Sequence, residues 1–388
     1  MWKKMKKILI ITTIGGFLPQ FELNDIKLLS ERGYEIHYAS NFDNPVYDID
    51  EKKLEQMGIV LHPICIHKSP THIWQNFTAL REICNIIRTQ DIKAIHCHNP
   101  MGGVLARIAA FICGKKKIYV IYTAHGFHFY KDASIINWLF FFPVEYLLAK
   151  LTDSLITINR EDYLRAKGFR TLKGKEIFQI PGVGVDVSKF ADVMESKDAI
   201  REELGIPKDA FYMLSVGELN HNKNHEIIIR AVAEIKSHNV YYGICGSGYH
   251  EQYLRNLAKE LGVEDRIRIY GFRKDIPKML KGADVFVFPS LREGLGIAAI
   301  EAMAAGLPMV TSDCRGTREY MEEGITGRVC YSGSVTEYKE VIEWMMKHPD
   351  ERQKMSQASR TKAQKFDIKQ TEAIMRNVYS KITVDERG

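Results

Sequence analysis

The sequence lacks the marks of a disulfide-stapled, zinc-binding or membrane-spanning protein. Its 388 residues contain seven cysteines, an odd number scattered along the chain without a C-x-x-C pair. We therefore expect neither a disulfide framework nor a structural zinc site, and a reducing cytoplasm as the compartment. The longest apolar stretch, residues 135–151, is interrupted by Pro143 and Glu145 and is too short for a membrane-spanning helix. The basic first residues are followed by no small-residue cleavage site, so no signal peptide is predicted.

Two further absences argue against other classes of protein. No basic helix with interleaved aromatic residues occurs, so nucleic acid is not an expected partner. Gly15-Gly16 follows the first apolar run, but a complete G-x-G-x-x-G fingerprint is missing there. The sequence therefore argues against a nicotinamide-dependent enzyme, although two glycines after a strand still let backbone amides approach a phosphate.

Charge is unevenly distributed along the chain. The net charge is +6, yet residues 1–190 carry 25 Lys and Arg against 18 Asp and Glu, about +7, and the remainder is close to neutral. A basic first half favours contact with an anionic membrane surface or an anionic lipid-diphosphate substrate. The aromatic run Trp-Leu-Phe-Phe-Phe at 138–142 supports peripheral membrane contact, but a helix buried in the core would give the same pattern. Both interpretations stay open.

Apolar strand-like runs alternate with helical patterns through both halves of the chain. This βα repetition predicts parallel sheets covered by helices on both faces. Strands are expected at residues 7–13, 34–40, 92–96, 117–123 and 154–158, and again at 212–216, 241–245, 267–270, 283–288 and 309–312. Between the two series, Pro181-Gly182-Val183-Gly184 marks a linker. A chain of this length is expected to form two domains, so the sequence predicts an α/β protein with two doubly wound, Rossmann-like domains.

The stretch from residue 283 to residue 303 combines a strand, a glycine loop and a helix start. The Val and Phe residues of the strand suit a buried parallel sheet, and Pro289 ends it. Gly294 and Gly296 carry no Cβ, so the backbone can come close to a ligand. From Ile297 onward the residues are good helix formers. The free N–H groups and the positive dipole end of that helix predict an anion-binding site.

Two carboxylates, Glu293 and Glu301, lie on either side of this predicted anion site. A carboxylate accepts two hydroxyl hydrogen bonds at once, which suits a sugar ring or a ribose. Taken alone, the pair would be interpreted as a loop charge and a helix surface charge. The whole run, EGLGIAAIEAMAAGLP from residue 293 to residue 308, resembles the E-x7-E motif of retaining nucleotide-sugar glycosyltransferases, in particular glycosyltransferase family 4.

The resemblance implies the GT-B fold, in which two Rossmann-like domains face each other across a ligand-binding cleft. The expected organisation is an acceptor-binding domain at residues 1–184, a nucleotide-sugar-binding domain at 185–365, and a C-terminal helix at 366–388 that returns to the first domain. By resemblance, Glu293 contacts the transferred sugar and Glu301 contacts the ribose. The donor would further be held by four residues of the loop and helix start: Gly294, Leu295, Gly296 and Ile297.

A second match to the family follows the strand expected at 212–216. Gly217 and Lys223 resemble positions of the family's Gly-Arg-Leu…Lys loop, whose arginine and lysine bind the donor diphosphate. The lysine role carries over to Lys223, a mobile point charge, but this chain has Glu218 where the arginine is usual. Three more positions resemble turns and segments near the nucleotide: Gly246, Phe272 and Arg273.

His125 follows the strand expected at 117–123, in the run Thr-Ala-His-Gly-Phe-His. A lone histidine is often structural, but this one lies at a strand end before a glycine. It resembles the family's cleft histidine, which contacts the transferred sugar near its reacting carbon. Gly15 and Gly16 match the family's glycine loop beside the donor diphosphate and the acceptor.

No metal ion is expected at the site. His96 and His98 share a strand face, but two ligands without a third are poor evidence for zinc. The D-x-D run at 48–50 is formally the metal–diphosphate motif of the other glycosyltransferase fold, but it does not follow a buried strand and is interpreted as a loop. A helix end together with Lys223 can hold a leaving diphosphate without a metal ion. No cofactor is predicted, because the nucleotide sugar is a substrate.

The sequence thus predicts a retaining glycosyltransferase that moves a sugar from a nucleoside diphosphate sugar, by resemblance a UDP-sugar, to a hydroxyl acceptor. The expected acceptor is a glycan or a lipid-diphosphate-linked glycan of polysaccharide assembly, and the expected place is the cytoplasm, at the inner face of the membrane if the membrane is contacted. His125, Lys223 and Glu293 are the predicted catalytic residues. Two alternatives are an epimerase of nucleotide sugars with the same fold, and a non-catalytic subunit that binds nucleotide sugars.

Overall fold

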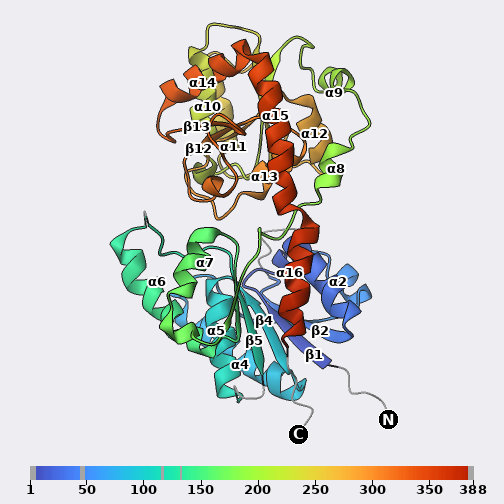
Figure 1. Cartoon of the computed structure of the whole chain (residues 1–388), viewed down its shortest axis with the longest axis vertical. Helices are drawn as coiled ribbons and strands as arrows, with labels where there is room; N and C mark the ends of the chain where they lie inside the picture. The colour runs from blue at the N-terminus through green and yellow to red at the C-terminus, as the bar shows by residue number, and fades with distance from the viewer. Residues whose placement is uncertain (1–5, 44–48, 115–117, 132, 383–388) are drawn as a thin grey trace. The chain divides into compact units, whose positions relative to one another are not determined.

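The computed structural model describes residues 6–43, 49–114, 118–131 and 133–382. The chain divides into two compact units (Figure 1). The first comprises the residues up to Val183 together with those from Lys369, and the second comprises Gly184–Ile368. Each unit is a parallel sheet with helices packed on it, so the predicted α/β architecture with two Rossmann-like sheets is confirmed.

The first unit is built on a seven-stranded sheet in the order β3-β2-β1-β4-β5-β6-β7, in which all neighbours pair in parallel. Its strands are β1 Lys6–Ile11, β2 Tyr34–Ser40, β3 Ile59–Pro63, β4 Ala94–His98, β5 Tyr119–Ala124, β6 Ser154–Thr157 and β7 Glu176–Gln179. Its α-helices are α1 Phe17–Phe21, α2 Leu23–Glu31, α3 Glu51–Gln56, α4 Ile73–Thr89, α5 Pro100–Ile112, α6 Ile135–Leu148, α7 Arg160–Lys167 and α16 Ile368–Ser380.

The central strands of this unit are buried on both faces, as their apolar sequences require. Leu9, Ile95 and Val120 have no exposed surface and lie in a core to which α4 and α5 contribute. The last helix, α16, is anchored to the same unit by a buried hydrogen bond. The hydroxyl of Tyr379 on α16 donates to Oδ2 of Asp25 on α2 at 2.7 Å. The C-terminal helix therefore completes the first unit.

The second unit is built on a six-stranded parallel sheet in the order β10-β9-β8-β11-β12-β13. Its strands are β8 Phe211–Val216, β9 Val240–Cys245, β10 Ile267–Ile269, β11 Val285–Phe288, β12 Met309–Ser312 and β13 Gly327–Cys330. Its α-helices are α8 Val187–Ala191, α9 Lys197–Glu203, α10 His225–Glu234, α11 Glu251–Glu260, α12 Ile276–Gly282, α13 Ile297–Ala304, α14 Val335–Lys347 and α15 Pro349–Ala363.

The expected elements differ from the observed ones mainly where short strands were missed. Strands β3, β7 and β13 at the sheet edges were not predicted. In the D-x-D run, residue 48 lies outside the described residues. Asp50 caps α3, because its Oδ1 accepts a hydrogen bond from the Lys53 amide at 3.1 Å. That carboxylate therefore has a structural role.

Candidate functional site

The candidate site residues of the second unit lie on loops at one edge of its sheet. The carboxyl ends of parallel strands share an edge, and four of these loops follow β8, β9, β10 and β11. β8 is the first strand of the unit; β9 and β10 lie on one side of it and β11 lies on the other. The loops after β8 and β11 therefore flank the topological switch point, where such sheets bind ligands. They carry Lys223 and Glu293.

Two asparagines hold the loops after β8 and β11 together. The backbone amide of Leu291 donates to the Asn222 carbonyl at 2.8 Å, and Nδ2 of Asn222 donates to the Arg292 carbonyl at 2.9 Å. Asn224 adopts a left-handed conformation with φ of 54°, and its Nδ2 reaches the Pro289 carbonyl at 3.2 Å. The sequence prediction missed both asparagines, although asparagine is a residue type that is common in turns and tolerates positive φ.

Lys223 and Glu293 form an ion pair with each other. Nζ of Lys223 lies 2.6 Å from Oε1 of Glu293, and 20% and 12% of their side chains are exposed. The ammonium also lies 5.1 Å from the centre of the Phe288 ring. Two of the three predicted catalytic residues are thus brought together. A diphosphate that approaches Lys223 meets an ammonium already paired with a carboxylate.

The glycines of the neighbouring loops allow close backbone packing. The amide of Gly217 donates to the Cys245 carbonyl at 3.0 Å, and the amide of Gly246 donates to the Gly271 carbonyl at 2.8 Å. A Cβ on Gly246 would lie 1.8 Å from the Gly217 oxygen, and its φ of 155° disfavours other residues. Glycine at position 246 therefore allows the loops after β8, β9 and β10 to pack closely together. The N–H of Gly246 already has an acceptor and is not available to a ligand.

The loop after β11 delivers the amino end of α13 to the same edge. Gly296 precedes the helix with φ of 86°, and a Cβ there would lie 2.8 Å from the Phe288 ring. Leu295 is buried, so its side chain helps to fix the loop. Gly294 completes the loop, and Gly296 offers no side chain to cap the helix. The Ala299 amide already donates to the Gly296 carbonyl at 3.0 Å, so the amides of Ile297 and Ala298 are the ones placed as an anion site requires.

Glu301 lies one turn into α13. Burial raises the pKa of Glu301 to about 7, although Lys189 on α8 lowers it in part. The carboxyl is therefore protonated in a large fraction of molecules at neutral pH. Hydroxyl donors such as those of a ribose would favour the ionised form.

The remaining predicted residues of this unit have different surroundings. Phe272 is 69% exposed, so its ring is available to a ligand. Arg273 forms a two-point ion pair with Asp275, in which Nε lies 2.8 Å from Oδ1. Glu218 is exposed and accepts a hydrogen bond from Nδ2 of Asn220 at 2.9 Å. The loop after β8 contains no arginine, and the Arg273 guanidinium is already paired with Asp275. Neither therefore replaces the arginine that the family usually has at the position of Glu218.

In the first unit, His125 follows β5 directly and contacts His98, the last residue of β4. Nε2 of His125 lies 3.2 Å from Nδ1 of His98. Burial lowers the pKa of His125 to about 4 and that of His98 well below its usual range, so both rings are neutral at pH 7. The Gly15 amide already donates to the Asn41 carbonyl at 2.9 Å, and Gly16 precedes the five-residue helix α1.

Glu22 joins this histidine pair and was missed by the sequence prediction. Its Oε1 lies 3.4 Å from Nδ1 of His98 and 4.0 Å from Nε2 of His125, so the three side chains offer donor atoms to a metal ion. Burial, with Asp25 nearby, raises the pKa of Glu22 well above its ordinary value. A carboxylic acid is a poor metal ligand, so the chemistry of this set fits a hydrogen-bonded network better. The absence of a metal stays a prediction.

Two parallel, doubly wound units with an open helix end at a switch point define an α/β protein of the GT-B class. Comparison with known families gives the assignment. The profile "Glycosyl transferases group 1" matches residues 196–362, and "Glycosyl transferase 4-like" matches residues 13–159. The chain therefore belongs to the glycosyltransferases of the family 4 type, and the resemblance drawn from the E-x7-E run is confirmed.

Individual relatives extend over most of the chain. EpsD of Bacillus subtilis, which carries a glycosyltransferase name, is 36% identical over 97% of this chain and 96% of its own length. An Escherichia coli galactosyltransferase, named for transfer from UDP-Gal to an N-acetylglucosaminyl diphosphoundecaprenol, is 27% identical over 81% and 80%. Among solved structures, HepE of Anabaena in complex with UDP superposes with a TM-score of 0.76 at 20% identity, over 97% of this chain and 100% of its own.

The raised pKa of Glu301 predicts a pH-dependent stability. Between about pH 4.5 and pH 7 the carboxyl is protonated in the folded protein and ionised in the unfolded chain, so stability falls as the pH rises through this range. We expect Glu301→Gln to remove that loss. The free energy of unfolding of the variant should gain up to about 3 kcal/mol on wild type across the range. Denaturant unfolding at several pH values measures it. Glu260→Gln, at an exposed residue of α11, is the control. If the free energy of unfolding changes with pH in the same way for wild type and Glu301→Gln, the raised pKa of Glu301 is contradicted.

Proposed function

We propose that the protein is a retaining glycosyltransferase that moves a sugar from a UDP-sugar to a hydroxyl of a glycan acceptor. The observation that carries the proposal is the Lys223–Glu293 pair beside the open amino end of α13 at the switch point. This edge combines a cation and free amides for a diphosphate with a carboxylate for sugar hydroxyls. The UDP complex of HepE and the UDP-Gal in the name of the Escherichia coli relative support the choice of nucleotide.

Each residue of the site has a distinct proposed role. Lys223 and the α13 amides stabilise the diphosphate as the glycosidic bond breaks and negative charge grows on it. Glu293 and the amides of Gly294–Gly296 orient the sugar, and Glu301 binds the ribose. The leaving phosphate oxygen accepts the acceptor's proton on the same face of the sugar, so retention requires no protein base. His125, neutral at pH 7, donates or accepts a hydrogen bond near the reacting carbon.

The acceptor is proposed to be a lipid-diphosphate-linked glycan of polysaccharide assembly, handled in the cytoplasm at the inner membrane face. The name of the Escherichia coli relative contains such an acceptor, and the basic first half of this chain suits an anionic lipid diphosphate. None of the described helices has the length and apolar character needed to cross a bilayer. Contact with the membrane would therefore be made from its surface.

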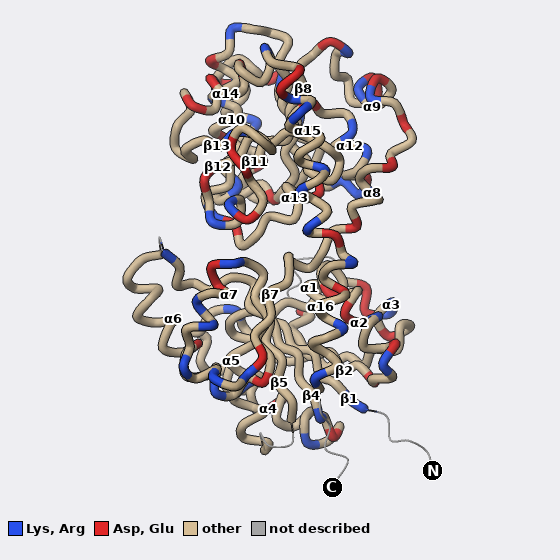
Figure 2. Tube along the Cα trace, in the orientation of Figure 1, with Lys and Arg blue, Asp and Glu red and all other residues tan. Residues whose placement is uncertain are grey.

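Helix α6 offers a surface for that contact. Its inner side chains, Trp138, Phe141, Phe142 and Tyr146, pack against the core of the first unit. Its outer face, from 42% to 77% exposed, is apolar throughout: Ile135, Ile136, Leu139, Phe140, Val144 and Leu147. The first turns of α6 are tan in Figure 2, because the one charged residue of this helix, Glu145, lies near its end. The Glu145 carboxylate is buried against Arg107. Burial in the core thus accounts for the inner face of α6, and contact with the membrane is proposed for its outer face.

Incubation with a panel of nucleotide sugars tests the activity. We expect slow release of UDP from one UDP-sugar, with the freed sugar first appearing in the anomeric configuration of the donor, as NMR reports. Free nucleotide together with an epimerised sugar would instead support an epimerase. Release from none of the donors would support a non-catalytic binding subunit, and a freed sugar of opposite configuration would contradict retention.

Lys223→Ala should lower kcat by about 10²-fold or more, because a cation here helps the transition state more than the ground state. The variant should still fold, with a lower melting temperature because Glu293 loses its partner. Lys223→Arg should restore only part of the rate, since the guanidinium is larger and planar. Steady-state turnover measures both, with Lys259→Ala, at an exposed residue of α11, as the control. If Lys223→Ala retains more than about a tenth of the wild-type kcat, another cation must stabilise the leaving diphosphate.

The outer face of α6 should carry vesicle binding. We expect co-sedimentation with anionic vesicles at low salt, weakened by high salt because charge attraction is screened. Leu139→Ser together with Phe140→Ser should reduce binding about a hundredfold, since each large apolar side chain contributes about tenfold on burial. Met194→Ser, at an apolar residue of the second unit that is 94% exposed, is the matched control. Equal binding by the double variant and wild type would rule out α6 as the contact.

A further inference from the structure

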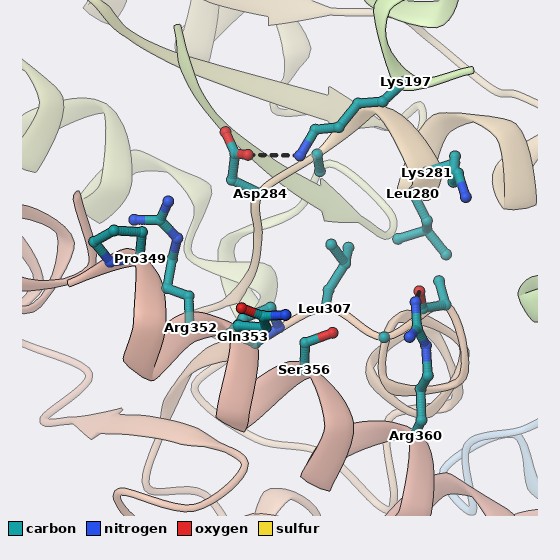
Figure 3. A pocket seen from close by; sticks show the side chains of 14 residues that line it. Lys197, Leu280, Lys281, Asp284, Leu307, Pro349, Arg352, Gln353, Ser356 and Arg360 are labelled. Atoms are coloured by element: carbon teal, nitrogen blue, oxygen red, sulfur yellow. Dashed lines mark hydrogen bonds and ion pairs between the residues drawn. The ribbon is translucent and has the colours of Figure 1, made fainter. Parts of the chain in front are cut away.

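A pocket of about 320 Å³ opens at the amino edge of the sheet in the second unit (Figure 3). Its lining includes Asp284, directly before β11, and Leu307 and Pro308, directly before β12. The amino ends of parallel strands share one edge, opposite to the edge that carries the loops of Lys223 and Glu293. The four residues of β11 separate the two edges by about 13 Å. The pocket is therefore distinct from the candidate donor site.

Cations outnumber carboxylates around this pocket. Four basic side chains line it: Lys197, Lys281, Arg352 and Arg360. Asp284 is the one carboxylate in the lining within the described part of the chain. Arg352, Ser356 and Arg360 are spaced by four residues along α15 and so share one face of that helix. Figure 3 shows the two arginines on either side of Gln353 and Ser356.

Asp284 offsets only part of this charge, because it pairs with one lining cation, Lys197, and with Arg201 outside the lining. Oδ1 accepts from Nζ of Lys197 at 2.6 Å, and Oδ2 accepts from Nη2 of Arg201 at 2.7 Å and from the Tyr212 amide at 2.8 Å. Burial alone would raise the pKa of Asp284, but these partners together hold it below its ordinary value. In the described structure, no ion pair links the other three lining cations to a carboxylate.

The two arginines are fixed by neighbouring helix ends and still offer donors. Nη1 of Arg352 donates to the carbonyls of Met345 and Met346 near the end of α14, and its guanidinium lies 5.2 Å from the Phe211 ring. Nη2 of Arg360 donates to the Ala305 carbonyl after α13 at 3.4 Å. A guanidinium has five N–H groups, so each arginine keeps donors for a ligand. A fixed fork of this kind matches phosphate oxygens.

We propose that this pocket binds a small phosphate-bearing anion. Arg352 and Arg360 grip its oxygens as forks, Lys281 adds a point charge, and Ser356 adds a neutral donor. The volume lies at the lower end of small-molecule sites, which suits an inorganic diphosphate or a sugar phosphate better than a whole nucleotide sugar. The proposal rests on the second unit alone and is independent of the proposed reaction.

Calorimetric titration of the full chain with inorganic diphosphate at low ionic strength tests the proposal. We expect saturable binding by wild type and also by Lys223→Ala, whose candidate donor site has lost its cation. In the Lys223→Ala background, Lys281→Gln together with Arg360→Gln should weaken the affinity about a hundredfold, because each charge-assisted contact contributes about tenfold. Lys354→Gln should leave it unchanged, since Lys354 is an exposed α15 residue outside the lining that pairs with Glu351.

Thermal melts distinguish lost binding from lost folding. Arg360→Gln could lower the melting temperature. In that case Lys281→Gln alone must still weaken diphosphate binding about tenfold, because the Lys281 ammonium holds no other described residue in place. Three results would overturn the proposal. They are no binding at millimolar diphosphate, an affinity unchanged in the pocket variants, and binding that disappears in Lys223→Ala, which would assign the anion to the candidate donor site.

Discussion

The candidate site of the second unit depends on one partly buried ion pair, that of Lys223 with Glu293. Such a pair persists only if the loops that carry it are fixed, and Asn222 and Asn224 fix them by binding backbone groups of the loop after β11. Removing either charge leaves the other poorly solvated, which costs more than an exposed pair would. The Glu293 carboxylate is the ion-pair partner of the lysine. In the proposed reaction a diphosphate would have to share Lys223 with that carboxylate.

Burial sets the charge state in the first unit. His96, His98 and His125 lie close together beside Glu22 and Asp25, and burial lowers the pKa of each histidine. Burial also raises the pKa of both carboxyls, to about 6 for Asp25. Burial thus favours the neutral form of each of these side chains, because removing an ionised group from water is costly.

The sequence was most informative where function and local chemistry coincide. The strands at 34–40 and 309–312 have the predicted limits, because apolar runs with clear turn signals mark both ends. The start of α13 at Ile297 also has the predicted place. The pairing of Lys223 with Glu293 was not predictable, since seventy residues separate them and two asparagine contacts create the geometry. The same holds for Glu22 and His98, which only the strand order brings together. The outer face of α6 was ambiguous because both of its faces are apolar.

The two ends of helix α13 differ in how their backbone polar groups are satisfied. Its carboxyl end is satisfied by protein, since Arg360 donates to the Ala305 carbonyl and complements the negative end of the dipole. Its amino end follows Gly296, which offers no side chain to cap it. A serine or aspartate side chain at an N-cap would occupy the amides. The φ of 86° and the nearby Phe288 ring both require glycine. The same constraint that shapes the loop therefore leaves the amino end of α13 without a side-chain cap.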